Sequence, residues 1–191
     1  MVKLDKIYTR AGDGGTTRLA TGEEIAKSSP RVSAYGDVDE TNSAVGVARL
    51  HAGGEPALDA MLARIQNELF DLGADLATPV RDKPLPFEAL RIVASQVKAL
   101  ENDIDTLNAD LAPLTSFVLP AGNALSAHLH LARAIARRAE RSIAAVASDD
   151  DERVSDDALK YANRLSDFLF VAARWANRAE GDVLWTPGGT R

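Results

Sequence analysis

Three arginines and a glutamate have spacings that would place them together on one face of a helix. Arg133, Arg137 and Arg141 follow one another at intervals of four residues, and Glu140 precedes the last of them. At the helical rotation per residue, these four side chains span an arc of about 100°. Arginines at this spacing repel one another, which favours an anionic ligand such as a phosphate. A solvated basic surface is the alternative that the spacing alone leaves open.

A second candidate site is the glycine-rich segment over residues 9–18, which reads TRAGDGGTTR. Glycines permit turns in which several backbone N–H groups converge, and the neighbouring hydroxyls and cations suit a polyphosphate. The segment is not a P-loop, because no Gly-Lys-Ser/Thr follows the glycines. Lys27 and Arg31 lie just beyond it and would complete an anion site. A flexible glycine-rich arm without a ligand remains the alternative.

A third polar group, Asn163 and Asp167, stands at a four-residue spacing and could face the arginine helix or form a structural pair. Metal chemistry is not indicated. No glutamate is followed by a histidine three residues later, so a ferritin-like di-iron site is absent. His128 and His130 would lie about 200° apart on a helix, and His51 stands alone near a helix end. We therefore expect no transition-metal site built by the protein.

The composition excludes further classes of function. The chain has 191 residues, 22 Lys and Arg against 28 Asp and Glu, a net charge of −6 and no cysteine. Disulfides, zinc-thiolate sites, iron–sulfur clusters and thiolate nucleophiles are thereby excluded. The acidic balance disfavours general nucleic-acid binding. Any chemistry must use oxygen or nitrogen groups, or a reactive atom brought by a bound molecule.

The chain is expected to form one cytoplasmic domain over residues 1–191. Its longest uncharged stretch, residues 111–132, contains two prolines, an asparagine and two histidines, which together disfavour a membrane span. The first residues lack the apolar run and cleavage site of a secretory signal. No membrane and no nucleic-acid partner is therefore expected.

Apolar residues recur at spacings of three and four in five segments, each of which predicts a helix. The expected helices run from about 32 to 53, 56 to 78, 86 to 111, 123 to 147 and 156 to 180. Asp37 and Glu40 resemble a capping box near the first helix start. An acidic connection over 149–152 precedes the last helix. The prediction is an all-α, antiparallel bundle of four or five helices over 32–180, with an arm over 1–31 and a tail over 181–191.

The connection over residues 112–122 is apolar, yet prolines bracket it, so it is expected to be ordered and non-helical. Phe117 lies in its middle. An apolar loop of this kind needs something to cover it. The tail, including Trp185, is given no role.

Five segments taken together resemble the PduO-type ATP:cob(I)alamin adenosyltransferases. They are residues 8–17 (YTRAGDGGTT), 31–40 (RVSAYGDVDE), 117–120 (FVLP), 133–141 (RAIARRAER) and 163–167 (NRLSD). The resemblance covers nearly the whole chain in the same order. One departure is Ala121-Gly122, where the family commonly has two glycines. The resemblance implies a trimeric helical bundle that binds ATP between neighbouring subunits, with the arm of one facing the arginine helix of the other.

The resemblance also implies the ATP-binding residues and the reaction. Reduced cobalt would attack the 5′ carbon of ATP and release triphosphate, with Mg²⁺ on the phosphates and Glu140 as the nearest candidate to contact it. The implied ATP contacts are Thr9, Arg10, Ala11, Gly12, Thr17, Arg18 and Lys27 from the arm, and Arg137, Arg138, Ala139, Glu140, Arg141 and Asn163 from the bundle.

On the corrinoid side, the resemblance implies three catalytic residues and one lining residue. Phe117 matches an aromatic side chain that occupies the lower face of the corrin and displaces its dimethylbenzimidazole ligand. Arg133 and Asp39 match an ion pair between subunits, and Phe170 matches a lining residue. The implied partners are a cobalamin reductant and an adenosylcobalamin-dependent client enzyme. Alternatives are a non-catalytic ATP-binding scaffold or corrinoid escort, and a helical interaction protein with a basic patch.

Overall fold

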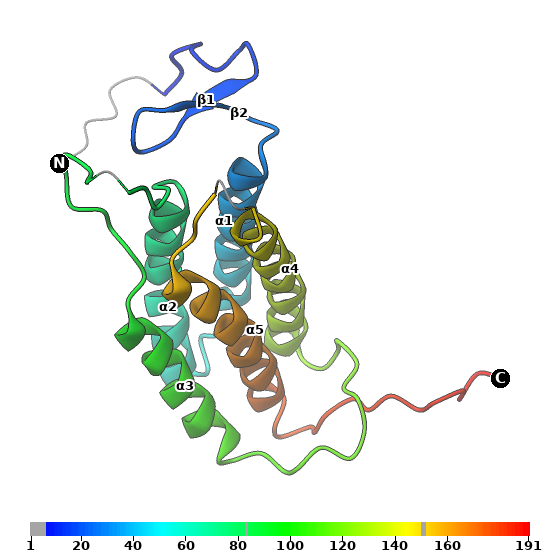
Figure 1. Ribbon diagram of the computed structural model, residues 1–191. Helices are drawn as coiled ribbons and strands as arrows, with labels where there is room; N and C mark the ends of the chain where they lie inside the picture. The colour runs from blue at the N-terminus through cyan, green and yellow to red at the C-terminus, as the bar shows by residue number, and fades with distance from the viewer. Residues whose placement is uncertain (1–6, 83, 150–151) are drawn as a thin grey trace.

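Five α-helices lie side by side and form the body of the molecule (Figure 1), in a computed structural model that describes residues 7–82, 84–149 and 152–191. The helices are α1 (Pro30–Arg49), α2 (Pro56–Leu76), α3 (Ala94–Asn108), α4 (Ala124–Ala147) and α5 (Asp156–Ala176). The arm adds a small antiparallel hairpin of β1 (Thr16–Arg18) and β2 (Glu24–Ala26). The expected helical bundle is confirmed, whereas the hairpin was not predicted. Residues 1–6 of the expected arm and 150–151 of the acidic connection lie outside the described residues.

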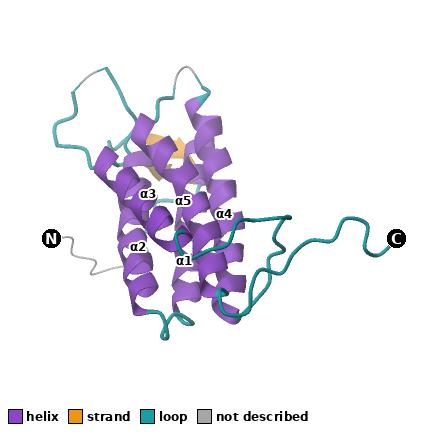
Figure 2. Cartoon of the chain, turned by 90° about the horizontal axis from the view of Figure 1, so that it is seen from below, coloured by secondary structure: helices purple, strands orange, loops and turns teal. Residues whose placement is uncertain are grey.

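The helices enclose one hydrophobic core. Helix α1 packs against α2 and α4, α4 packs against α5, and α5 packs against α3 (Figure 2). The periodic leucines and isoleucine of α2 are all buried, as the spacing predicted; they are Leu58, Leu62, Ile65, Leu69, Leu72 and Leu76. Each such side chain stabilises the fold by about 1.5–3 kcal/mol relative to an exposed one. None of the described helices is long and apolar enough to cross a membrane.

The start of α1 corrects the expected capping box. Ser29 caps the helix, its hydroxyl accepting a hydrogen bond from the N–H of Arg31 (3.2 Å), and Pro30 occupies the first helical position. Asp37 and Glu40 therefore lie well inside the helix. Their carboxylates are used instead to bind Arg138 of α4. The acidic pair marks a contact between helices and not a helix end.

The start of α3 is also corrected. A helix was expected from about residue 86, but α3 begins at Ala94, and Leu90 and Val93 are 54 % and 49 % exposed. The buried carboxylate of Asp75 accepts a hydrogen bond from the N–H of Ile92 (2.9 Å) and pairs with Arg91 (2.6 Å). These bonds hold the chain before α3 in a non-helical path, so the tertiary contact overrides the apolar period. The last helix likewise ends at Ala176, and 177–180 form turns.

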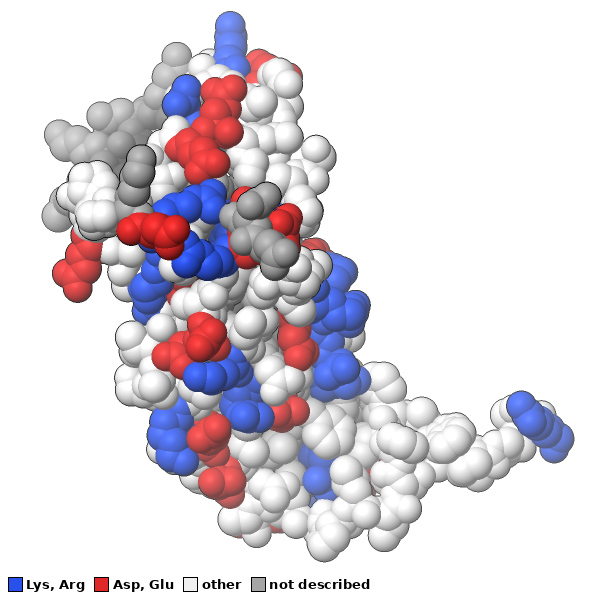
Figure 3. Space-filling view, viewed as in Figure 1, with Lys and Arg blue, Asp and Glu red and all other residues white. Residues whose placement is uncertain are grey.

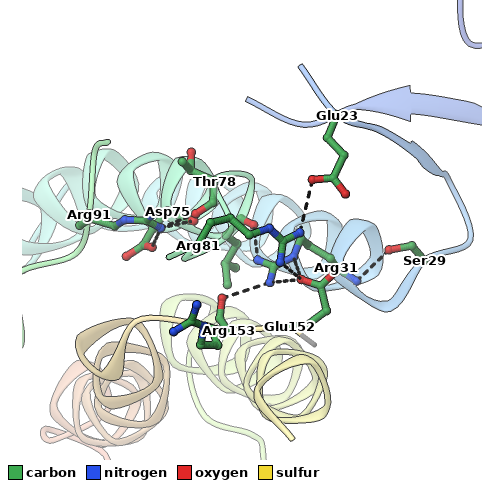
Figure 4. A network of polar contacts seen from close by, with 10 residues as sticks. Glu23, Ser29, Arg31, Asp75, Thr78, Arg81, Arg91, Glu152 and Arg153 are labelled. Carbon is green, nitrogen blue, oxygen red and sulfur yellow. Dashed lines mark hydrogen bonds and ion pairs between the residues drawn. The ribbon is translucent and has the colours of Figure 1, made fainter. Parts of the chain in front are cut away.

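A polar network fixes the root of the arm to the bundle (Figure 4). Arg31 is only 2 % exposed and donates hydrogen bonds to Glu152 (2.9 and 2.5 Å) and to the carbonyl of Leu76 (2.7 Å). Arg81 lies 3.8 Å from the same glutamate and 3.3 Å from Glu23 in the hairpin turn. Arg31 is therefore a structural residue and does not complete an anion site in the arm.

Candidate functional site

A cavity of about 430 Å³ opens in the arm. It is lined by Thr9, Ala11, Gly12, Thr16, Thr17, Arg18, Glu24 and Lys27. A Cβ at Gly12 would lie 2.9 Å from Nζ of Lys27, so glycine at this position lets the ammonium group close over the loop. The N–H of Lys27 donates to the carbonyl of Gly15 (2.8 Å) and folds the loop back. The structure thus brings most of the predicted arm residues together, with Arg10 outside this lining.

The arm is held against the end of the bundle. The side chain of Leu19 is buried, and the N–H of Ala20 donates to the carbonyl of Ala77 at the end of α2 (3.0 Å). Tyr35 of α1 shares a side-chain hydrogen bond with Thr17; burial raises the pKa of Tyr35, and this bond opposes the rise. The hairpin that lines the cavity is therefore fixed to the end of the bundle.

The arginine face of α4 is assembled as the spacing predicted. Arg137 and Arg141 are exposed, and neither makes an ion pair with another residue in the described part of the chain. Glu140 accepts a hydrogen bond from Nδ2 of Asn163 on α5 (2.8 Å). Of the two alternatives left open by the spacing, the structure shows Asn163 in contact with the arginine helix. Basic side chains gather along the α4 edge of the molecule in Figure 3.

Two predicted ATP contacts lie away from this face. Arg138 pairs with Asp37 of α1 (3.1 Å) and with Glu40, and these hydrogen bonds raise its pKa. Ala139 is buried in the hydrophobic core. The structure does not bring either side chain to Arg137 and Arg141.

Arg133 lies in an unusual electrostatic setting. Its guanidinium is half-buried, and its Nε atom has no hydrogen-bond partner among the described residues. Burial lowers the pKa of Arg133, and the neighbouring charge of Arg137 lowers it further. The guanidinium lies over the ring of Phe170, whose centroid is 5.9 Å from Cζ. A buried Nε donor without an acceptor favours the binding of a carboxylate or another anion.

A second cavity, of about 560 Å³, adjoins Arg133. It is lined by Leu114, Thr115, Ser116, Phe117, Val118, Arg133 and Phe170. The side chain of Phe117 is 77 % exposed. The apolar loop therefore does not place this ring in the core. Phe117, Arg133 and Phe170, which the resemblance assigned to the corrinoid side, line one cavity.

Asp39 is not brought to Arg133 within one chain. It lies on α1 and lines a different hollow of about 300 Å³ between α1 and α2, beside Tyr35 and Phe70. The arm cavity, similarly, is lined by arm residues without the arginines of α4. A pairing of Asp39 with Arg133 requires a second copy of the chain.

The described residues include few groups that could hold a metal ion. Among the residues that the structure describes, no group of three or more His, Asp or Glu side chains could bind one. The carboxylate of Glu140, oriented by Asn163, is the predicted candidate for a Mg²⁺ ion carried by phosphates. Such ions are commonly held by one or two carboxylates together with substrate phosphates.

Contacts between aromatic rings were not predicted from the sequence, among them the following two. The rings of His51 and His128 stack with centroids 4.9 Å apart. Trp185, which was given no role, packs edge-on against Phe117. No spacing signal links these residues, because each pair comes from distant parts of the chain.

A sequence profile described as cobalamin adenosyltransferase matches residues 7–176. The chain belongs to the cobalamin adenosyltransferase family. A corrinoid adenosyltransferase of Mycobacterium tuberculosis is 49% identical over 190 residues, covering 100% of this chain and 97% of that protein. A corrinoid adenosyltransferase of Bacillus subtilis is 41% identical over 179 residues, and the match covers 92% of this chain and 89% of that protein. The resemblance seen in the five motifs is confirmed.

Solved structures of family members share the fold. A PduO-type ATP:corrinoid adenosyltransferase of Lactobacillus reuteri, solved as a phenylalanine-to-alanine variant with cobalamin and ATP, is 40% identical. The two structures superpose with a TM-score of 0.83, and the match covers 94% of this chain and 99% of that chain. An arginine-to-lysine variant complexed with ATP gives a TM-score of 0.84 at 40% identity, covering 94% of this chain and 100% of that chain.

Proposed function

We propose that this protein transfers the 5′-deoxyadenosyl group of ATP to the cobalt of cob(I)alamin, giving adenosylcobalamin and triphosphate. One observation carries the proposal in this member of the family. A single chain presents a cationic arm cavity, two exposed arginines on α4 that have no ion-pair partner among the described residues, and an apolar cavity beside the exposed Phe117. These features suit a nucleotide and a corrin, the two reactants of adenosyl transfer.

The chemistry asks for no protein nucleophile. The electron pair of Co(I) forms the bond to C5′ of ATP, and the C5′–O5′ bond breaks with its electrons leaving on triphosphate. Cobalt ends as Co(III). The protein has to orient the two reactants and stabilise the negative charge of the departing phosphates. The absence of cysteine from the chain is therefore no obstacle.

On the ATP side, the arm and helix α4 have different roles. Lys27, Thr17 and the turn at Gly12 bind the nucleotide in the arm cavity. Arg137 and Arg141 have no carboxylate partner in the described part of the chain, so they are available to bind the phosphates. Bound Mg²⁺ would add positive charge on the phosphates, and Glu140 is the side chain placed to contact it.

On the corrinoid side, Phe117 occupies the position below the corrin. Its exposed ring and the ring of Phe170 give the 560 Å³ cavity an apolar character. An apolar group at the lower face leaves no room for the dimethylbenzimidazole ligand, and loss of that ligand makes Co(II) easier to reduce. Phe117 is thus the catalytic residue for the reduction that precedes transfer.

The complete site lies between copies of the chain in a homotrimer. Two features of the single chain support this arrangement. The buried Nε of Arg133 lacks an acceptor among described residues, and Asp39 stands on another face. A neighbouring subunit's Asp39 would supply the missing carboxylate, while its arm would meet Arg137. A cytoplasmic location, a cobalamin reductant and an adenosylcobalamin-dependent client enzyme complete the proposal.

An anaerobic assay tests the activity. Chemically reduced cob(I)alamin, ATP and Mg²⁺ are mixed with the protein, the cobalt–alkyl absorbance is followed, and the products are separated by chromatography. Protein-dependent formation of both adenosylcobalamin and triphosphate is the expected result. Binding of ATP without either product would favour the scaffold or escort alternative. No binding of ATP would favour the interaction protein.

A further inference from the structure

The C-terminal tail runs beside the loop that carries Phe117. The N–H of Trp185 donates to the carbonyl of Phe117 (2.8 Å), and the N–H of Leu119 donates to the carbonyl of Val183 (2.8 Å). An antiparallel bridge joins the two segments between these bonds. Figures 1 and 2 both show the tail meeting the connection between α3 and α4. We call residues 182–185 the tail segment and residues 112–122 the Phe117 loop.

The side chains add to this backbone pairing. The ring of Trp185 lies edge-on to that of Phe117, with centroids 5.9 Å apart and planes at 62°. The hydroxyl of Ser116 donates to the carbonyl of Trp185 (2.8 Å). Trp185 is 43 % exposed, and Phe117 is more exposed still. The hydrophobic core therefore holds neither ring, and the contact between the two rings restricts the direction of each.

Both segments are anchored to the same buried cation. Arg174 of α5 donates to the carboxylate of Asp182 at the start of the tail segment (2.9 Å) and to the carbonyl of Ala112 at the start of the Phe117 loop (2.8 Å). Nδ2 of Asn177 donates to the carbonyl of Gly181 (2.6 Å), just before the tail segment. The tail segment is consequently a fixed support and not a free end.

We propose that Trp185 is a positioning residue, which holds the ring of Phe117 over the cavity where the corrin binds. This inference rests on the proposed function. Trp185 acts through Phe117 by its ring contact and its backbone hydrogen bond. A ring that is already held in place loses less conformational freedom when the corrin meets it. The contact with Trp185 therefore favours binding of the corrinoid in the form whose cobalt has lost its lower ligand.

Three variants test the role of the Trp185 ring. Trp185→Ala removes the ring, Trp185→Phe keeps an aromatic ring, and Leu184→Ala is the matched control, because neighbouring side chains of an extended segment point to opposite faces. Each protein is saturated with ATP and loaded with cob(II)alamin. Electron paramagnetic resonance then gives the fraction of cobalt that has lost its axial nitrogen. Urea unfolding confirms that each variant is folded.

We expect Trp185→Ala to lower that fraction about three- to tenfold while ATP affinity stays within about twofold. Trp185→Phe should restore most of the loss, and Leu184→Ala should match the wild type. Asp182→Asn weakens the anchor to Arg174 without touching either ring, and it should change the fraction in the same direction. An unchanged fraction in both Trp185→Ala and Asp182→Asn would overturn the proposal.

A double variant shows whether Trp185 acts through Phe117. In a Phe117→Ala background, Trp185→Ala should add no further loss, because the ring to be positioned is gone. Additive losses would contradict a positioning role. The wild type is also assayed with cob(I)alamin. Failure to form adenosylcobalamin there would count against the proposed function, whereas an active wild type with an unaffected Trp185→Ala variant would overturn only the role of Trp185.

Discussion

Arg137 and Arg138 are neighbours in sequence but lie in opposite electrostatic settings. Arg138 is neutralised within the chain by Asp37 and Glu40, whereas Arg137 has no carboxylate partner among the described residues. A helix turns about 100° per residue, which separates the two side chains. Arg137 is therefore the arginine available to an incoming phosphate, and Arg138 primarily joins α4 to α1.

This difference leads to a division of labour between two residues. Arg137→Ala should weaken ATP binding about 10- to 100-fold, because it removes a charge-assisted hydrogen bond to phosphate. Phe117→Ala should leave ATP affinity nearly unchanged and impair the reaction that starts from cob(II)alamin. Calorimetric titration with ATP and the anaerobic assay measure the two effects. Arg164→Ala is the matched control, because Arg164 of α5 is paired with Glu101 and Asp167 within the chain. Equal losses of ATP affinity in the Arg137 and Phe117 variants would contradict this division.

His130 predicts a pH dependence of stability. It is buried on α4; burial lowers its pKa, the charge of Arg133 lowers it further, and Asp182 opposes the change. In acid, the unfolded chain then binds a proton more readily than the folded one, so stability from this residue is present above about pH 6.5 and falls as pH decreases. Urea unfolding at pH 7.5 and 5.5 should show a larger loss for the wild type than for His130→Gln. An equal loss in both would exclude His130 as a source.

At the residue scale, spacing predicted side chains that share one helix. It placed Arg137, Arg141 and Glu140 on one face, whereas the contact of Asn163 with Glu140 was only one of two alternatives that the spacing left open. It misread Asp37 as part of a helix cap, because a carboxylate that binds an arginine on another helix has the same local pattern as a capping residue. Local sequence does not encode that distant partner.

The junction between the Phe117 loop and α4 shows how elements are joined. Gly122 has φ of +107°, and a Cβ there would lie 2.7 Å from Cγ of Asn177. Oδ1 of Asn177 accepts from the N–H of Asn123 (2.9 Å), and its amide donates to Gly181. One buried side chain thus connects the start of α4, the end of α5 and the tail. Of the two positions where the family commonly has glycines, only the second has this backbone requirement.

Gly122→Ala should therefore destabilise the protein by about 2–3 kcal/mol, through backbone strain and displacement of Asn177. Ala121→Gly, which restores the double glycine, should change stability by less than about 1 kcal/mol. The free energy of unfolding in urea measures both. Similar costs for the two variants would show that the left-handed backbone and the close approach to Asn177 are unimportant.

At the element scale, periodicity predicted all five helices, but it did not predict where α3 begins. Leu90 and Val93 continue the apolar spacing outside the helix. The buried carboxylate of Asp75 accepts a hydrogen bond from the N–H of Ile92 and so keeps the residues before Ala94 out of the helix. The hairpin of the arm was missed for a related reason. Its strands have three residues each, too few for an alternating pattern.

At the scale of the whole molecule, Arg133 and Asp39, which form no ion pair among the described residues, lie on separate faces. Arg133 lines the 560 Å³ cavity beside Phe117, and Asp39 lines the hollow between α1 and α2. In a head-to-tail contact, the Arg133 face of one copy meets the Asp39 face of the next. Such contacts form a closed ring when the rotation between copies returns to the first copy. Such a ring would satisfy both groups in every subunit and complete each ATP site.

Charge reversal tests this arrangement. Asp39→Arg and Arg133→Asp should each weaken assembly at least about tenfold, because like charges then meet across the interface. The double variant should recover much of the loss. Sedimentation velocity over a range of protein concentrations measures the effect. Arg153→Asp, in an exposed surface pair with Asp82, is the control and should leave assembly unchanged. Lack of recovery in the double variant would contradict a direct pairing.

The helical fold could be predicted from the sequence because apolar residues recur at helical spacings, and the family and its reaction could be predicted because five motifs occur in collinear order. The support of Phe117 by Trp185 could not, because a few backbone bonds between segments about 66 residues apart leave no periodic signal. The pairing of Asp39 with Arg133 is implied by the family resemblance alone, and it would depend on geometry between copies, which a single chain does not contain.

The most direct test of adenosyl transfer follows the bond that forms. ATP labelled with ¹³C at C5′ is incubated anaerobically with the protein, Mg²⁺ and cob(I)alamin, and the products are observed by ¹³C and ³¹P nuclear magnetic resonance. The expected result is one labelled carbon bonded to cobalt for each inorganic triphosphate released. If the label stays in ATP, or leaves as adenosine or a nucleotide without a cobalt–carbon signal, this protein does not catalyse the transfer.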